Sequence, residues 1–333
     1  WAGPAGETTE MENDCAHYAT SGYRPPAAVV ALARKELSGP VELLAGHPPY
    51  QAWLPGATEA PRYHETQYLG RTFSLGSQVE GGAGDVNGCK LIVENSKGHV
   101  ADYVVPSSQA KGNVCVNRAG NDRIAQCRNA LVWLRPADKK PVEWNWAVPA
   151  STQVEKVGEV SFLKWEKTWA AVHPINAAYV GLDAKRKGMF GDAKDKEKVA
   201  GGIFAGTAAS TGISGFAVEV DDAGDYEAFK AAVSAKSKLD VSALADGKAA
   251  FTAASGAQVA LQIGAEGVKV WRDGAPHDLA KDHVVLWRTT AGGPAVDLPY
   301  KSGALKVQAG GHTFTGTIDL ATGVYVSSSV LAK

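Results

Sequence analysis

The chain has 333 residues, of which 45% are hydrophobic, so it can bury a substantial core in one large or two medium domains. Lysine and arginine number 34 against 35 acidic residues, and the formal net charge of -1 gives no overall field that would favour a nucleic acid or an anionic membrane. No apolar run approaches the roughly 20 residues that a membrane-spanning helix needs. The composition therefore predicts a folded protein that would hold a polyanion only through a local patch.

The chain opens on Trp1 rather than on a methionine, and we expect a processed product or a fragment. The four cysteines contain no CxxC pair, which excludes zinc-ribbon spacing. An even cysteine count beside nine tryptophans and only two methionines favours an exported protein, extracellular or periplasmic, with one or two disulfides, although buried free thiols also fit. The favoured bridge joins Cys115 and Cys127, which flank a polar loop.

The first predicted element is a helix between Pro26 and Leu44, where apolar residues recur at helical spacing. Proline marks its start and a Ser-Gly-Pro sequence marks its stop. Residues 45–61 are rich in proline and glycine, which predicts an ordered connector. Helix and connector together make the first predicted part of the chain, residues 1–55.

Beyond the connector, short segments rich in Val, Trp and Tyr alternate with turn residues, a pattern typical of antiparallel strands. We place a first β-sandwich region at 56–220 and a helix insertion with a second β-region at 221–333. The inserted helix is predicted over 225–239, and Asn-Gly and Asp-Gly pairs mark hairpin turns. The predicted fold class is mainly β: a large antiparallel β-sandwich, of supersandwich type, preceded by a short helical segment.

A first candidate constellation lies near the start of the chain, where five polar and aromatic residues precede the predicted helix: Asn13, His17, Tyr18, Tyr23 and Arg24. Elimination from a uronic-acid sugar needs a group that neutralises the carboxylate, a base for the C5 proton and an acid for the leaving oxygen. Asn or Arg, His and Tyr suit these three tasks. In the alternative reading, the aromatic side chains pack a junction and the arginine caps backbone carbonyls.

A second candidate lies in residues 62–76, which we predict to be the first strand of the sandwich. On a regular strand His64 and Tyr68 share one face, whereas Arg71 points to the other. A tyrosine beside a histidine or arginine could transfer protons in a lyase. The alternative is an edge strand with ordinary aromatic packing.

Tryptophan pairs form a third theme, since Trp144 and Trp146 share one strand face and Trp165 and Trp169 are similarly placed. Exposed indoles would offer platforms for sugar rings, whereas buried ones would build the core of a sandwich, which is the favoured interpretation.

Other chemistry has little support in the sequence. It contains no GxSxG, HExxH, P-loop or dinucleotide-binding motif, and the histidines form no close pair with metal-ligand spacing. The glycine-rich residues 81–88 lack the alternating acids and the terminal glutamate of an EF-hand loop. We therefore predict no cofactor and no metal.

The order of the parts carries a resemblance: an "HYATSGYRPP" segment, a proline-rich crossing, a strand with "YHETQYLGRTFSLGS" and a long β-region ending in "GALKVQAGGHTFTGTIDL". It resembles the C-terminal half of polysaccharide lyases that join an (α/α) toroid to a multi-layer β-sandwich, as in heparinase II/III-like and chondroitin or hyaluronate lyase-like proteins. The resemblance covers most of the chain and implies catalysis without an organic cofactor. It would place Asn13, His17, Tyr18 and Arg24 at the last loops of the toroid, with His64 and Tyr68 on the sandwich side of a cleft.

Almost the whole toroid is missing from this chain, so either a further chain completes the cleft or the β-portion serves as a binding or structural module. We expect an exported protein that binds or eliminatively cleaves an acidic polysaccharide. The alternative is a non-catalytic extracellular structural or assembly subunit built from β-sandwiches, with self-assembly or a further chain as its partner. A hydrolase would need two carboxylates across a cleft, and Glu59 and Glu65 make a poor pair for it. Neither a nucleic acid nor a membrane is an expected partner.

Overall fold

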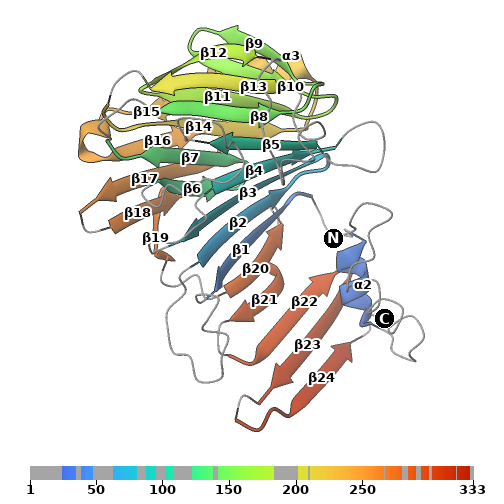
Figure 1. Cartoon of the computed structure of the whole chain (residues 1–333). Helices are drawn as coiled ribbons and strands as arrows, with labels where there is room; N and C mark the ends of the chain where they lie inside the picture. The colour runs from blue at the N-terminus through green and yellow to red at the C-terminus, as the bar shows by residue number, and fades with distance from the viewer. Residues whose placement is uncertain are drawn as a thin grey trace, which may run out of the picture.

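The computed structural model describes residues 25–34, 39–47, 63–80, 88–94, 102–107, 122–137, 142–183, 202–208, 211–265, 267–279, 284–289, 294–299, 302–319 and 321–330. This part of the chain is mainly β, with three antiparallel sheets and one short helix early in the sequence (Figure 1). The predicted fold class is confirmed. How the chain divides into domains stays a prediction. The largest sheet takes strands from all three predicted parts.

Thirteen strands form the largest sheet, in the order β12-β13-β8-β5-β4-β3-β2-β1-β20-β21-β22-β23-β24. Figure 1 shows this sheet running from β12 and β13 at the top to β24 at the lower right. The bounds are β1 (Val41–His47), β2 (Tyr63–Leu69), β3 (Phe73–Glu80), β4 (Gly88–Val93), β5 (Asp102–Ser107), β8 (Glu143–Val148), β12 (Ala177–Asp183), β13 (Gly202–Ala208), β20 (Val284–Thr289), β21 (Pro294–Pro299), β22 (Ala304–Ala309), β23 (His312–Ile318) and β24 (Tyr325–Val330).

The described residues form two further, smaller sheets. The six-stranded sheet has the order β6 (Arg123–Cys127), β7 (Ala130–Arg135), β14 (Ser214–Asp221), β11 (Trp169–Ile175), β10 (Val160–Lys164) and β9 (Gln153–Val157). The five-stranded sheet has the order β15 (Lys238–Asp240), β16 (Lys248–Thr252), β17 (Gln258–Gly264), β18 (Gly267–Arg272) and β19 (Ala275–His277).

The six-stranded sheet is the middle of three layers. Along β7, Leu131 and Trp133 pack in the core shared with the thirteen-stranded sheet, whereas Val132 and Leu134 pack in the core shared with the five-stranded sheet. Successive strand residues point to opposite faces, so a strand buried on both faces is apolar at every position. The continuous run "ALVWL" in β7 therefore follows from its central place.

Among the described residues, two α-helices cover parts of the sheets. Helix α2 (Ala27–Ala33) packs Ala28 against Val307 of β22 and Phe314 of β23. Helix α3 (Tyr226–Lys236) confirms the predicted insertion, and its buried Phe229 packs on β10 and β11 of the middle sheet. A short 3₁₀ helix, η2 (Leu244–Asp246), precedes β16.

The helix predicted between Pro26 and Leu44 is correct only at its start. The structure ends α2 at Ala33 and forms strand β1 from Val41, after Gly39 with a φ of 103° and Pro40. Gly39, in the left-handed region, and Pro40 are incompatible with a helix that continues to Leu44, and pairing with β2 and β20 then buries Val41 and Leu44 of β1. Residues 45–47, predicted as connector, belong to β1; residues 48–62 lie outside the described part. The predicted strand at 62–76 is a turn-linked pair, β2 and β3, and follows β1 in the sheet.

The tryptophan pairs lie in the core, which confirms the favoured interpretation. Trp144 and Trp146 are 0% and 1% exposed, and Trp165 and Trp169 are also buried. The Trp146 indole Nε1 donates a 3.0 Å hydrogen bond to Tyr179 Oη, so the polar atom of this buried ring is satisfied.

The expected bridge between Cys115 and Cys127 does not form in this structure. Cys127 is a free thiol, 1% exposed, and Cys89 is also free and buried; Cys15 and Cys115 lie outside the described residues. Cys127 packs among apolar side chains from the middle and five-stranded sheets. Within the described part, no helix is long and apolar enough to cross a membrane.

Candidate functional site

The residues of the first predicted constellation, Asn13, His17, Tyr18, Tyr23 and Arg24, lie outside the described residues. The second candidate, on β2, is described from His64 onward through Tyr68 and the following turn. Strand β2 is an interior strand, paired with β1 on one side and β3 on the other.

His64 and Tyr68 project from the same face of β2, as the alternation predicts. Tyr68 stands opposite Glu42 of β1 and Leu75 of β3, and its ring lies 5.9 Å from that of Phe73. The side chain is only 9% exposed and belongs to the core between the thirteen-stranded sheet and the middle sheet. Tyr68 therefore has little direct access to a polymer in this arrangement.

Burial also sets the protonation state of Tyr68. Desolvation raises the pKa of this phenol to about 12, and the carboxylates of Asp221 and Asp222 add to the rise while Arg128 opposes it. The phenol stays protonated at neutral pH and could donate a proton but not accept one.

Arg71 lies in the turn between β2 and β3 and fastens that turn to the end of β14. The backbone amide of Arg71 donates to Asp222 Oδ2 at 2.5 Å, and the amide of Thr72 donates to the same oxygen at 2.7 Å. The Arg71 guanidinium donates to the Asp222 carbonyl oxygen at 2.7 Å. The Arg71 guanidinium thus takes part in a contact between the thirteen-stranded sheet and the middle sheet.

Beside Tyr68 the structure reveals a buried carboxylate that the sequence analysis missed. Glu42 is 2% exposed, and its Oε1 accepts hydrogen bonds from the Arg272 guanidinium and, at 2.7 Å, from the backbone amide of Arg128. Arg272 is 230 residues away in the sequence. No local pattern signals such a pair.

A second arrangement lies on the outer face of the five-stranded sheet. Alternation along β16, β17 and β18 turns apolar residues such as Phe251, Leu261 and Val270 inward against the middle sheet. The alternate positions form what we call the lysine-tryptophan face: Lys238, Lys248, Gln258, Gln262, Lys269 and Trp271.

The register brings Lys248 and Lys269 into one row across the sheet. Lys248 of β16 pairs with Gln262 of β17, which pairs with Lys269 of β18. Two residues further along the strands, on the same face, Trp271 pairs with Ala260. The Lys248 Nζ lies 4.6 Å from the centre of the Trp271 indole ring. Because β17 runs between β16 and β18, the lysine and the indole meet above the small side chain of Ala260. This contact is a cation-π interaction.

The outward positions of the described strands of this face carry three lysines, Lys238, Lys248 and Lys269, and the carboxylate of Asp240. Hydrogen bonds from the Ser242 hydroxyl and amide lower the pKa of Asp240, with Lys248 adding to the effect, so that carboxylate is ionised at neutral pH. The face can hold anionic groups beside an apolar ring. No group of three His, Cys, Asp or Glu residues that could hold a metal occurs in the described part of the chain.

No model of a known protein family matches the chain, and neither a curated protein nor a solved structure is found to be similar to it. The resemblance to toroid and sandwich lyases therefore stays a prediction.

The segment "GVKVWRDG", residues 267–274, has the composition of a strand that ends in a turn. Its alternation already indicates that Lys269 and Trp271 share a face opposite Val270. Lys248 lies on β16, which is separated from β18 by β17. Only the pairing of these three strands shows that Lys248 shares this face.

Proposed function

We propose that the protein binds an acidic polysaccharide and that the lysine-tryptophan face holds it. The observation that carries the proposal is the contact of the Lys248 ammonium group with the Trp271 ring on the face of the five-stranded sheet that points away from the middle sheet. An ammonium group is a compact charge that pairs with carboxylate or sulfate. An indole beside it offers apolar area for the C–H surface of a sugar ring and a polar edge.

The energetics favour a polymer over a single acidic sugar. An exposed ion pair contributes only about 0.2 to 1 kcal/mol, so one lysine would hold a monosaccharide weakly. A chain with repeated charges can engage several lysines at once, and the later contacts then form within one complex. Because these charges face water, we expect the affinity to fall steeply as salt is added.

The proposal is limited to binding, because the protonated and buried Tyr68 supplies no exposed base for elimination. Cleavage by residues at the start of the chain, His17, Tyr18 and Arg24, is a separate proposal that rests on the chemistry of these residue types and on the lyase resemblance. Ultraviolet absorbance of the unsaturated uronate product, followed during incubation with each polymer, tests it directly.

The experiment compares the binding of heparin, hyaluronan and neutral dextran to the purified protein by titration calorimetry at low and high salt. We expect the two acidic chains to bind at low salt and dextran not to bind. The double variant Lys248→Gln and Lys269→Gln should weaken binding about tenfold, which corresponds to about 1.4 kcal/mol. The matched control is Lys156→Gln with Lys167→Gln, which removes the same charge from exposed positions elsewhere.

Equal weakening by the control pair would show that net charge, and not this face, governs binding. Failure of every acidic chain to bind the folded protein would overturn the proposal. The remaining explanation would then be a structural or assembly subunit, which measurement of oligomeric state would examine.

A further inference from the structure

Six strands lie at the ends of the three sheets in the described part of the chain: β12 and β24, β6 and β9, and β15 and β19. The outer edge of an end strand presents backbone N–H and C=O groups to which a further strand can pair. Proteins protect such edges with charged residues, proline, β-bulges, short strands or a covering layer. Among these six strands, five have such protection and β24 has none.

Four of the five protected edges are protected by their own sequence. Strand β12 has a bulge between Tyr179 and Gly181, and β9 carries Glu155 and Lys156. Strands β15 and β19 have only three residues each, and β19 contains Pro276. Each of these features makes pairing with another strand unfavourable.

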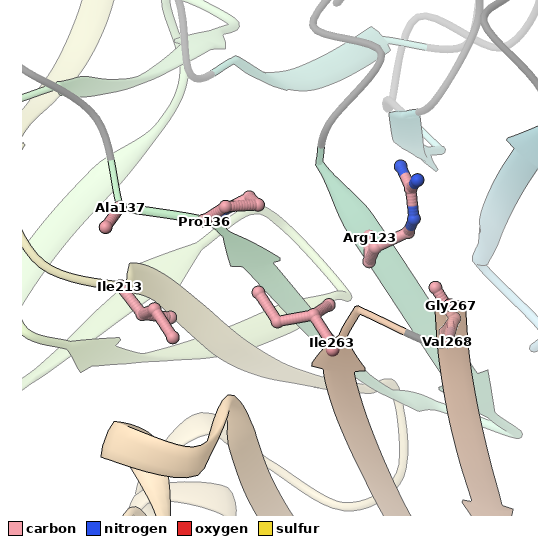
Figure 2. A pocket seen from close by; sticks show the side chains of 8 residues that line it. Arg123, Pro136, Ala137, Ile213, Ile263, Gly267 and Val268 are labelled. Carbon is pink, nitrogen blue, oxygen red and sulfur yellow. The ribbon is translucent and has the colours of Figure 1, made fainter.

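The fifth protected edge, that of β6, is covered by the neighbouring sheets. Figure 2 shows Arg123, at the start of β6, lining a pocket of about 310 Å³ together with Ile263 of β17 and Val268 of β18. Further along β6, the Gln126 amide Nε2 donates a 2.9 Å hydrogen bond to the carbonyl oxygen of Leu75 on β3. Four of the five residues of β6 are buried.

Strand β24 differs from the other five in sequence and in surroundings. It reads "YVSSSV", without a charge, a proline or a glycine, and it pairs with β23 without a register shift. Figure 1 shows it at the end of the largest sheet, away from the two smaller sheets. Val324 and Val326, at its start, are 58% and 63% exposed. The edge of β24 is thus a regular strand with apolar side chains in water.

The hydrogen bonds of the β23–β24 turn show which backbone groups of β24 point outward. The Asp319 amide donates a 2.9 Å hydrogen bond to the carbonyl oxygen of Val324, so the backbone groups of Val324 point toward β23. Along an antiparallel strand these groups alternate between the two sides. Those of Tyr325, Ser327 and Ser329 therefore point away from β23, toward the outer edge.

We propose that β24 pairs antiparallel with β24 of a second copy of this chain about a two-fold axis, so that the largest sheet continues from one copy into the other. The axis passes at Ser327, which lies opposite its own equivalent. Tyr325 of each copy lies opposite Ser329 of the other. In this register the outward backbone groups of all three positions meet as hydrogen-bonded pairs.

A second copy fits β24 because the strand is compatible with itself. A two-fold axis brings equivalent side chains close together, so a charged residue near it would oppose its own charge. β24 has no charged residue, and the formal net charge of the chain is only -1, so two copies repel each other little. Val326 becomes a diagonal neighbour of its equivalent, and the two exposed side chains then cover each other.

The pairing surface is distinct from the lysine-tryptophan face, which lies on the five-stranded sheet. Dimer formation through β24 therefore does not depend on the proposed binding of a polysaccharide, and either proposal can fail without the other.

The first test measures the mass of the full chain by sedimentation equilibrium over a range of concentrations. We expect a dimer that dissociates on dilution. Val326→Lys places two ammonium groups beside each other across the axis and should raise the dissociation constant at least tenfold at low salt. The matched control is Val180→Lys, which makes the same change at a 79% exposed position of β12, at the opposite end of the sheet, and should leave the dimer unchanged. A monomer at every concentration, or equal weakening by both variants, would overturn the proposal.

The second test examines the register by crosslinking. Ser327→Cys places a thiol at the axis, where the two Cα atoms of a hydrogen-bonded pair lie about 5.5 Å apart, within the range that a disulfide spans. Mild oxidation should link the two copies of this variant. Ser329→Cys, displaced from the axis, should give no more linked dimer than the native chain. No linked dimer from Ser327→Cys, or equal linking of Ser329→Cys, would show that the register is wrong. Circular dichroism reports whether each variant is folded, and the cysteine variants carry the test if Val326→Lys is not.

Discussion

At the scale of single residues, Glu42 joins all three layers. Glu42 lies on β1 of the thirteen-stranded sheet. Its carboxylate accepts a hydrogen bond from the backbone amide of Arg128, in the turn between β6 and β7 of the middle sheet, and forms an ion pair with Arg272 of the five-stranded sheet. Both charged side chains of the pair are nearly fully buried. Burying two charges costs desolvation free energy that their attraction offsets only while both partners are present.

We therefore predict that Arg272→Met destabilises the protein by about 3 to 5 kcal/mol, because it removes the buried ion pair between Arg272 and the Glu42 carboxylate. Adding Glu42→Gln should restore part of that loss, since the double variant buries no charge. Urea unfolding of the two single variants and the double variant measures the coupling. Strictly additive effects would show that the pair does not act as a unit.

At the scale of elements, the close approach of β14 to β7 depends on a glycine. A Cβ atom at Gly215 would lie 1.9 Å from the carbonyl oxygen of Trp133, too near for any side chain to fit without movement of the backbone. β14 lies between β7 and β11 in the middle sheet, so such a movement would disturb both cores.

Gly215→Ala should therefore cost about 1 to 3 kcal/mol or more of unfolding free energy, the usual range for overpacking. Gly88→Ala is the matched control, because a Cβ atom at Gly88, on β4 of the thirteen-stranded sheet, would meet nothing within 4 Å. Thermal and urea unfolding compare the two variants. Similar stability of both would mean that β14 can shift away from β7 at little cost.

At the scale of the whole molecule, the middle sheet contributes side chains to the cores on both of its faces. Cys89 belongs to the core on one side and Cys127 to the core on the other. Burial raises the pKa of both thiols, so neither is reactive in the folded protein. The two cysteines thus report separately on the two cores.

We expect Cys89 and Cys127 to become reactive at the same urea concentration, because loss of the middle sheet exposes both cores together. Pulse labelling with a thiol reagent, followed by mass spectrometry of the peptides, gives the two transitions. Labelling of Cys127 at a much lower urea concentration than Cys89 would show that the five-stranded sheet opens by itself.

The amino-acid sequence by itself determined the local elements of this protein. Alternating apolar residues and glycine turns predicted most strands, the run from Tyr226 to Lys236 predicted its helix, and the tryptophans were expected in the core. These features depend on contacts between near neighbours along the chain, which periodicity records. The shared face of His64 and Tyr68 followed from the same rule.

Only the tertiary structure decided how the strands are ordered and which distant residues meet. Residues 41–47, predicted as the end of a helix and the start of a connector, form a strand. Pairing with β2 and β20 stabilises this strand more than the local spacing of apolar residues stabilises a helix. It also paired Glu42 with Arg272 and brought Lys248 to Trp271 across an intervening strand. Such contacts are set by the burial of whole sheets against one another, a property of the complete chain that no single segment encodes.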